Sequence, residues 1–140
     1  MKHGTVLLAD THAPMLEGVR SILEEYFEVV VMVAHQNALL AAIERLDPDV
    51  AVIDVTFPTF RTEHLAMVHD RFPQIKVIAL SVHDERVVVD RVFALGAAAF
   101  VLKRSAAVAL PAAITDLFAG RRFISPAAQR GAGSTAGDDE

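Results

Sequence analysis

The chain has 140 residues, no cysteine and a formal net charge of −5 at pH 7. This length fits one domain, the missing cysteine excludes disulfides and cysteine metal sites, and the acidic balance argues against direct contact with nucleic acid. Charged residues interrupt every apolar stretch well before the roughly 18 residues of a membrane span, and the short run after Met1 is no signal peptide, which predicts a cytoplasmic protein without a membrane partner.

Five short apolar segments alternate along the chain with five segments of helical character. The predicted strands are residues 5–9, 28–33, 49–53, 75–80 and 98–102. Their continuous Val, Ile and Leu content is typical of strands that are covered on both faces, as in a parallel sheet. The alternation therefore predicts an α/β fold, a doubly wound (βα)5 domain with a five-stranded parallel sheet.

The first three segments between the strands carry apolar residues at helical spacing. The repeats are formed by Met15, Val19, Ile22, Leu23 and Tyr26, by Leu39, Leu40, Ile43 and Leu46, and by Leu65, Val68 and Phe72. Charged residues occupy the opposite face of the first segment, and prolines follow the second and third. Each segment is therefore predicted to form an amphipathic helix that packs one side on the sheet.

The last two helical segments are less regular. Residues 84–95 carry two apolar rows, more than one core-facing stripe needs, so this helix is either deeply packed or presents one row to a partner. In the next segment Pro111 lies six residues after a possible Ser105 cap, which predicts a kink or a helix that starts near Pro111 and ends at Gly120. Residues 127–140 are small, polar and patternless, which predicts a domain over 1–126 and a disordered tail with no output domain.

Polar side chains follow four of the predicted strands. Asp10 follows the first strand, Asp54 the third, Ser81 the fourth and Lys103 the fifth. In doubly wound folds, functional groups gather at the carboxyl ends of the strands. Phosphoryl transfer suits this set, because Asp54 offers a carboxylate nucleophile, a divalent cation held by carboxylates would neutralise charge, and Lys103 and Ser81 can contact the phosphoryl oxygens.

Several stretches at these positions carry a family resemblance. The segments LLADTH, VIDVTFP, ALSVHD and GAAAFVLK resemble receiver domains of bacterial response regulators, the CheY-like superfamily, over residues 4–126. The stretches LSVHD and RRFISP are similar to the corresponding stretches in receivers of the NarL/FixJ (LuxR-type) regulators, and those receivers precede a helix-turn-helix domain. The resemblance implies the flavodoxin-like strand order 2-1-3-4-5.

The resemblance also implies a role for each matching residue. Asp54 would accept a phosphoryl group from a sensor histidine kinase, in a phosphorelay of a two-component system. Magnesium would be held by Asp10, Asp54 and the backbone carbonyl of Thr56, while Ser81 and Lys103 would contact the phosphoryl group. The chain would then be a signalling domain, with no enzymatic activity beyond weak self-dephosphorylation, and would act on a downstream protein or as a homodimer.

Three further positions qualify this interpretation. Phe100 falls where the family has a rotating aromatic residue, which pairs it with Ser81 as the implied switch. Thr11 replaces the second acidic residue of the family, which predicts magnesium affinity reduced on the order of 10 to 100 fold. Arg61 lies where the family commonly has an acidic residue, and it either reaches the carboxylates or is simply solvated.

Two main functions remain open from the sequence. The first is a receiver that is phosphorylated on Asp54 and signals through a conformational switch. The second is an atypical, metal-impaired receiver that binds partners independently of phosphorylation, for which the surplus apolar row of residues 84–95 would be the contact. A flavin or nucleotide enzyme is disfavoured, because no glycine-rich phosphate loop follows the first strand.

Overall fold

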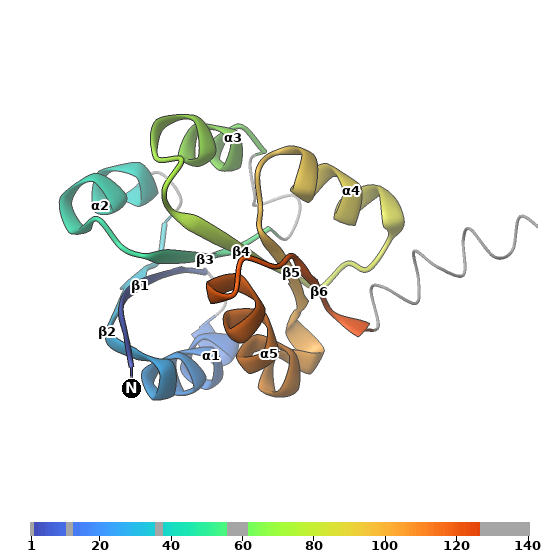
Figure 1. The fold of residues 1–140 in the computed structure, drawn as a ribbon, viewed down its shortest axis with the longest axis horizontal. Coiled ribbons are helices and arrows are strands. Elements are labelled where there is room, and N and C mark those ends of the chain that lie inside the picture. The colour runs from blue at the N-terminus through green and yellow to red at the C-terminus, as the bar shows by residue number, and fades with distance from the viewer. Residues whose placement is uncertain (1, 11–12, 36–37, 56–61, 127–140) are drawn as a thin grey trace, which may run out of the picture.

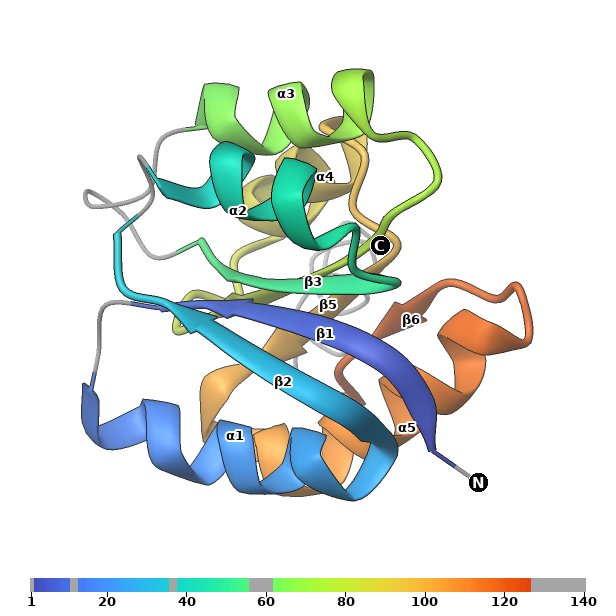
Figure 2. The ribbon, with the colours of Figure 1, turned by 90° about the vertical axis from the view of Figure 1, so that its left-hand side faces the viewer.

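One parallel sheet with helices on both faces forms the described part of the protein. The computed structural model describes residues 2–10, 13–35, 38–55 and 62–126. The six strands lie in the order β2-β1-β3-β4-β5-β6. Helices α1 and α5 cover one face of this sheet, and α2, α3 and α4 cover the other (Figures 1 and 2). The doubly wound α/β fold and the order of the first five strands are therefore confirmed.

The elements agree with the predicted segments to within a few residues at most ends. In chain order they are β1 (His3–Ala9), α1 (Ala13–Tyr26), β2 (Phe27–Val33), α2 (Leu39–Leu46), β3 (Val50–Asp54), α3 (Thr62–Arg71), β4 (Lys76–Ser81), α4 (Arg86–Ala94), β5 (Ala99–Leu102), the 3-10 turn η2 (Lys103–Ser105), α5 (Ala106–Phe118) and β6 (Phe123–Ile124). The strand β6 was not predicted. It pairs Phe123 with Ala99 and Ile124 with Phe100, and two residues are too few to give a periodic pattern.

The core has two halves, one on each face of the sheet. Every residue of β3 is buried. Its successive residues Val52 and Ile53 belong to opposite halves of the core, because successive side chains of a strand point to opposite faces of the sheet. Val52 packs on the side of α1 and α5, and Ile53 packs on the side of α2, α3 and α4. This arrangement explains why the strands are continuous apolar runs rather than alternating ones.

The two apolar rows of α4 differ in burial. In the row of Val89, Val92 and Phe93, the two valines are buried and Phe93 is partly buried. In the row of Val87, Val88 and Leu95, Val88 and Leu95 are partly buried against the core. Val87 is 73% exposed. The helix is thus packed through both rows, and among their members within the helix Val87 is the side chain that remains at the surface.

Helix α5 begins at Ala106, so the predicted start near Pro111 is wrong. Pro111 lies inside the helix, where its missing N–H leaves the carbonyl of Ala107 without the usual helical donor. Ala107 is exposed, so water can hydrate that carbonyl. The buried residues Leu110 and Ile114 hold the helix on the sheet, and this packing outweighs the local preference of proline.

The carboxyl end of α5 follows its prediction closely. Gly120 has a φ of 80°, its N–H donates to the carbonyl of Leu117, and the N–H of Arg121 donates to the carbonyl of Asp116. This is the usual glycine-terminated helix end. Within the described residues, no helix is long and apolar enough to cross a membrane. The disorder predicted for residues 127–140 lies outside the described part of the chain.

Candidate functional site

Four predicted site residues lie at the carboxyl edge of the sheet. Asp10 follows β1, Asp54 ends β3, Ser81 ends β4, and Lys103 follows β5. All four residues are at most 5% exposed. The pairing of β4 with β5 brings Ser81 close to Lys103, because Ser81 lies opposite Leu102, the residue before Lys103. The parallel topology therefore brings residues that are far apart in the sequence to one buried edge.

The ammonium group of Lys103 joins the two aspartates. Its Nζ atom lies 3.1 Å from Oδ2 of Asp10 and 3.1 Å from Oδ2 of Asp54, and it donates a hydrogen bond to Oδ1 of Asp10 at 3.3 Å. Charge-assisted contacts of this kind are strong in a buried setting, where removal of one partner leaves a charge without compensation. The cluster of Asp10, Asp54 and Lys103, which we call the acid–lysine cluster, is the electrostatic centre of the site.

The hydroxyl group of Ser81 is engaged by the loop that leads to α4. Its Oγ atom accepts a hydrogen bond from the N–H of His83 at 2.9 Å and donates one to the carbonyl of the same residue at 3.1 Å. The side chain is completely buried. Ser81 therefore fixes the path of the β4–α4 loop in this conformation.

The segment that follows β6 forms hydrogen bonds with the backbone of β5 around its aromatic residue, Phe100. Phe100 is fully buried among core residues on the α4 side. Its carbonyl accepts a hydrogen bond from the N–H of Ser125 at 2.8 Å, and Oγ of Ser125 accepts one from the N–H of Leu102 at 2.9 Å. Sequence reasoning missed Ser125, although it belongs to the RRFISP stretch that contributed to the family resemblance.

The donors available for a metal ion are few. Carboxylate oxygens are the ligands that Mg²⁺ prefers, and Asp10 and Asp54 supply two carboxylates. The described residues contain no group of three or more His, Cys, Asp or Glu residues that could hold a metal. Thr11, Thr56 and Arg61 lie outside the described residues. The carboxylates of Asp10 and Asp54 therefore fit Mg²⁺ as donors, and both also contact Lys103.

A mostly apolar groove of about 380 Å³ lies next to Lys103, between α1 and the start of α5. It is lined by Gly18, Val19, Ile22, Lys103, Arg104, Ala106 and Ala107. Arg104 forms an ion pair with Asp84 at 3.0 Å, which ties η2 to the β4–α4 loop. The groove therefore lies at the surface close to the acid–lysine cluster.

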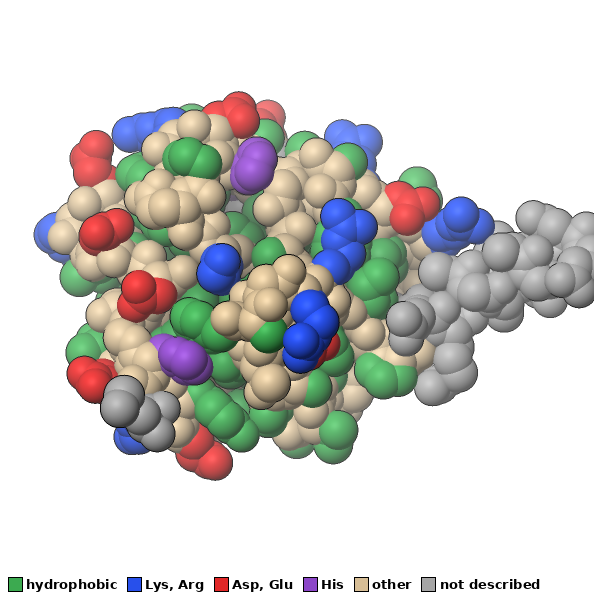
Figure 3. All heavy atoms as spheres, viewed as in Figure 1, with side chains coloured by type: hydrophobic (Ala, Val, Ile, Leu, Met, Phe, Trp, Pro, Cys, Tyr) green, Lys and Arg blue, Asp and Glu red, His purple; other side chains and the backbone are tan. Residues whose placement is uncertain are grey.

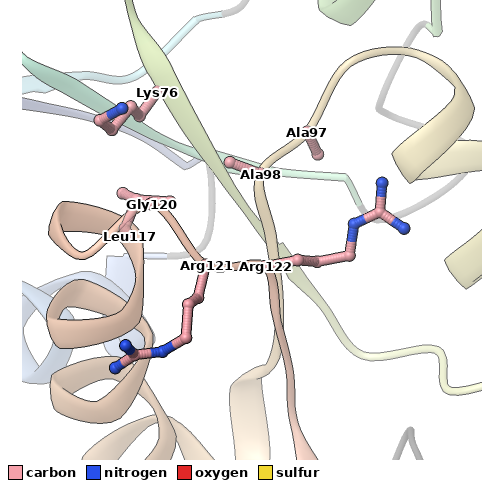
Figure 4. A pocket seen from close by; sticks show the side chains of 7 residues that line it. All are labelled: Lys76, Ala97, Ala98, Leu117, Gly120, Arg121 and Arg122. Atoms are coloured by element: carbon pink, nitrogen blue, oxygen red, sulfur yellow. The ribbon is translucent and has the colours of Figure 1, made fainter.

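A second cavity, of about 200 Å³, lies away from this edge, near the end of α5 and the start of β4 (Figure 4). Its charged residues are Lys76, Arg121 and Arg122, and Figure 4 shows their ends pointing apart. Lys and Arg side chains gather over this part of the surface in Figure 3. The guanidinium of Arg121 pairs with Asp116 at 2.9 Å, and that of Arg122 lies 4.4 Å from the centre of the Phe93 ring. We call this region the basic cavity.

The fold and the acid–lysine cluster place this protein in the class of doubly wound domains that carry acidic and lysine side chains at the carboxyl ends of their strands. The profile of the response regulator receiver domain matches residues 6–115, and the chain belongs to this family. It is the receiver domain of a two-component response regulator, which is a signalling domain.

The relatives support this assignment. The chain is 32% identical over 124 residues to the transcriptional regulatory protein DegU of Brevibacillus brevis, a match that covers 86% of this chain and 52% of DegU. It is 27% identical over 136 residues to RcsB of Escherichia coli K12, covering 93% of this chain and 63% of RcsB. The chain therefore spans between about half and two thirds of these regulators.

The solved structures agree with the fold. The isolated receiver domain of RcsB from Salmonella enterica serovar Typhimurium, in the presence of the phosphomimetic BeF₃⁻, superimposes with a TM-score of 0.83 and 26% identity. The match covers 92% of this chain and 98% of that one.

One prediction is overturned by these comparisons. The RcsB–DNA complex matches 94% of this chain and 68% of the RcsB chain, with a TM-score of 0.84 and 26% identity. The prediction of no nucleic-acid contact is therefore wrong as an exclusion. The net charge of −5 averages over 140 residues, and it reports neither local positive charge nor residues of a regulator that lie outside the compared span.

Proposed function

We propose that Asp54 is the phosphoacceptor and receives its phosphoryl group from a sensor histidine kinase. The supporting observation is the buried Asp54 carboxylate with the Lys103 ammonium 3.1 Å away, at the carboxyl edge of the sheet. A carboxylate oxygen of Asp54 attacks phosphorus, the phosphorus–nitrogen bond of the phosphohistidine breaks, and an acyl phosphate forms. Lys103 neutralises charge on the transferred oxygens.

Magnesium would be held by Asp10, Asp54 and the carbonyl of Thr56. Receiver domains of this family generally bind Mg²⁺, and the ion supplies neutralisation of the phosphoryl charge when bound. Thr11 offers a hydroxyl where a second carboxylate would stand, so the affinity for the ion is lowered. Asp10 orients Lys103 through the contacts at 3.1 and 3.3 Å. Weak self-dephosphorylation by attack of water would reset the domain.

The signal would leave the site through Ser81 and Phe100. A phosphoryl oxygen on Asp54 competes with His83 for the hydroxyl of Ser81, so the β4–α4 loop changes its path. Phe100 lies on β5, three residues before Lys103, and rearranges with that strand. A downstream protein or a second copy of the chain would recognise the altered surface, and the groove beside Lys103 would receive the kinase.

The proposal is tested by phosphorylation with acetyl phosphate and Mg²⁺, measured as intact mass. We expect one added phosphoryl group in the wild-type protein and none in Asp54→Asn. Asp90→Asn is the matched control, because Asp90 is an exposed aspartate that pairs with Arg86 on α4. An unchanged mass in the wild type at high Mg²⁺, or a phosphoryl group on Asp54→Asn, would contradict the proposal and favour an interaction module that is independent of phosphorylation.

A further inference from the structure

Strand β6 is followed by Ser125, whose side chain continues the hydrogen bonding of the sheet. β6 is the edge strand beside β5 (Figure 1). The N–H of Phe123 donates to the carbonyl of Ala98 at 3.4 Å, and the N–H of Ser125 donates to the carbonyl of Phe100 at 2.8 Å. In a regular parallel ladder, the N–H of Leu102 would next donate to the carbonyl of Ser125. It donates instead to Oγ of Ser125, at 2.9 Å.

The hydroxyl of Ser125 takes the place of a backbone carbonyl because the chain leaves the sheet at the next residue. Pro126 has helical conformation and carries no N–H, so the ladder between β5 and β6 stops there. Ser125 and Leu102 are both completely buried. A buried N–H needs an acceptor, since water cannot replace one at such a position. The side chain of Ser125 therefore supplies the acceptor for the last N–H of β5.

The backbone of Leu102 carries Lys103, so the contacts of Leu102 bear on the position of the lysine. Leu102 has extended backbone, with φ −77° and ψ 133°, and the turn η2 begins at Lys103. Its N–H is held by Ser125, and its carbonyl accepts a longer hydrogen bond of 3.4 Å from the hydroxyl of Ser105. From the next Cα atom the lysine side chain reaches Asp54, where Nζ lies 3.1 Å from Oδ2. Ser125 thus holds the strand end from which this reach begins.

We propose that Ser125 is a positioning residue for phosphoryl transfer, which acts through the N–H of Leu102 and fixes the backbone from which Lys103 reaches Asp54. This inference rests on the proposed role of Asp54. Ser125 lies beyond residue 115, where the match to the receiver profile ends. The carboxyl edge of the sheet then depends on the seating of β6, because displacement of Ser125 from β5 releases the peptide group that precedes Lys103.

The structural half of the proposal is tested by amide NMR spectra of the full chain. Ser125→Ala removes the hydroxyl but keeps the N–H that donates to Phe100. We expect the amide proton of Leu102 to shift upfield because it loses its acceptor, and the amide of Lys103 to shift with it. Ser105→Ala, the matched control on the same residue, should leave the Leu102 amide nearly unchanged. Changes in Ser125→Ala that are confined to residues 123–126 would overturn the proposal.

The functional half is tested by the rate of phosphoryl incorporation from acetyl phosphate with Mg²⁺, followed as intact mass. At saturating phosphodonor, Ser125→Ala should react more slowly on the order of tenfold, because small displacements of a charged group that contacts the reacting atoms lower the rate steeply. Ser105→Ala should stay within about twofold of the wild type. In a Lys103→Met background, adding Ser125→Ala should change the rate by less than about twofold, because the group that it positions is already gone.

The outcomes distinguish this inference from the proposed function. No incorporation into the wild type would contradict phosphoryl acceptance at Asp54, and the positioning role would fall with it. Incorporation into Ser125→Ala at the wild-type rate would overturn the positioning role alone. An equal slowing by Ser125→Ala with and without Lys103 would also overturn it, because a general loss of stability acts in both backgrounds. If Lys103→Met does not fold, the spectra and rates of the single variants decide.

Discussion

The acid–lysine cluster and the basic cavity both place basic side chains beside a groove or cavity, but they differ in how deeply their ion pairs are buried. In the acid–lysine cluster, the side chains of Lys103, Asp10 and Asp54 are 4%, 0% and 6% exposed and point toward one another. In the basic cavity, the side chains of Arg121 and Asp116 are 61% and 30% exposed, although their separation of 2.9 Å is slightly shorter. The comparison teaches that convergence and burial of opposite charges, rather than distance or the number of cations, distinguish a buried charge cluster from a solvated surface.

The largest expected effect comes from replacing Lys103 in the acid–lysine cluster. Lys76 of the basic cavity serves as the matched control. In the absence of Mg²⁺, Lys103→Met should lower the free energy of unfolding by about 3 to 5 kcal/mol, because two buried carboxylates lose their ammonium partner. Lys76→Met, in the basic cavity, should change it by less than about 0.5 kcal/mol. Urea unfolding in EDTA at neutral pH measures both values. Equal losses would show that burial of the cluster has no energetic consequence.

A smaller effect is expected from the hydroxyl groups near the site. Ser81→Ala should lower the free energy of unfolding by about 0.5 to 1.5 kcal/mol, because the partly buried backbone N–H and carbonyl of His83 lose their contact with the hydroxyl of Ser81. It should also slow phosphoryl incorporation from acetyl phosphate. Ser105→Ala is the control, since its hydroxyl is only half-buried and makes a long bond of 3.4 Å to the carbonyl of Leu102. A similar loss in both variants would argue against a special role of Ser81.

The sequence predicted the edge of the sheet at which the site lies, because an apolar run followed by a polar residue indicates where a strand ends. Asp10, Asp54 and Lys103 could be brought together from topology alone. Their contact distances could not, since one ammonium that joins two carboxylates depends on side-chain packing at separations of up to 93 residues in the chain. That long-range geometry is what turns three separate site residues into one buried cluster joined by the Lys103 ammonium.

Local signals failed where tertiary contacts decide the structure. Pro111 indicated a kink or a late start for α5, and the late start is wrong because the packing of Leu110 and Ile114 on the sheet keeps the helix continuous from Ala106. The two-residue strand β6 depends on pairing with β5 and on the hydrogen bonds of Ser125. Neither feature has a pattern within its own segment, so both required the neighbouring elements to be known.

The smallest predicted effects lie in the basic cavity and complete the contrast. Arg121→Ala should lower the free energy of unfolding by less than about 1 kcal/mol, since its pair with Asp116 is exposed, and the effect should fade as salt rises. Arg122→Ala should lower it by about 0.5 to 1 kcal/mol through the lost contact with the Phe93 ring. Urea unfolding at low and high sodium chloride measures both effects. A loss of several kcal/mol in either variant would mean that the basic cavity, like the acid–lysine cluster, depends on buried charge, and the distinction between the two regions would fail.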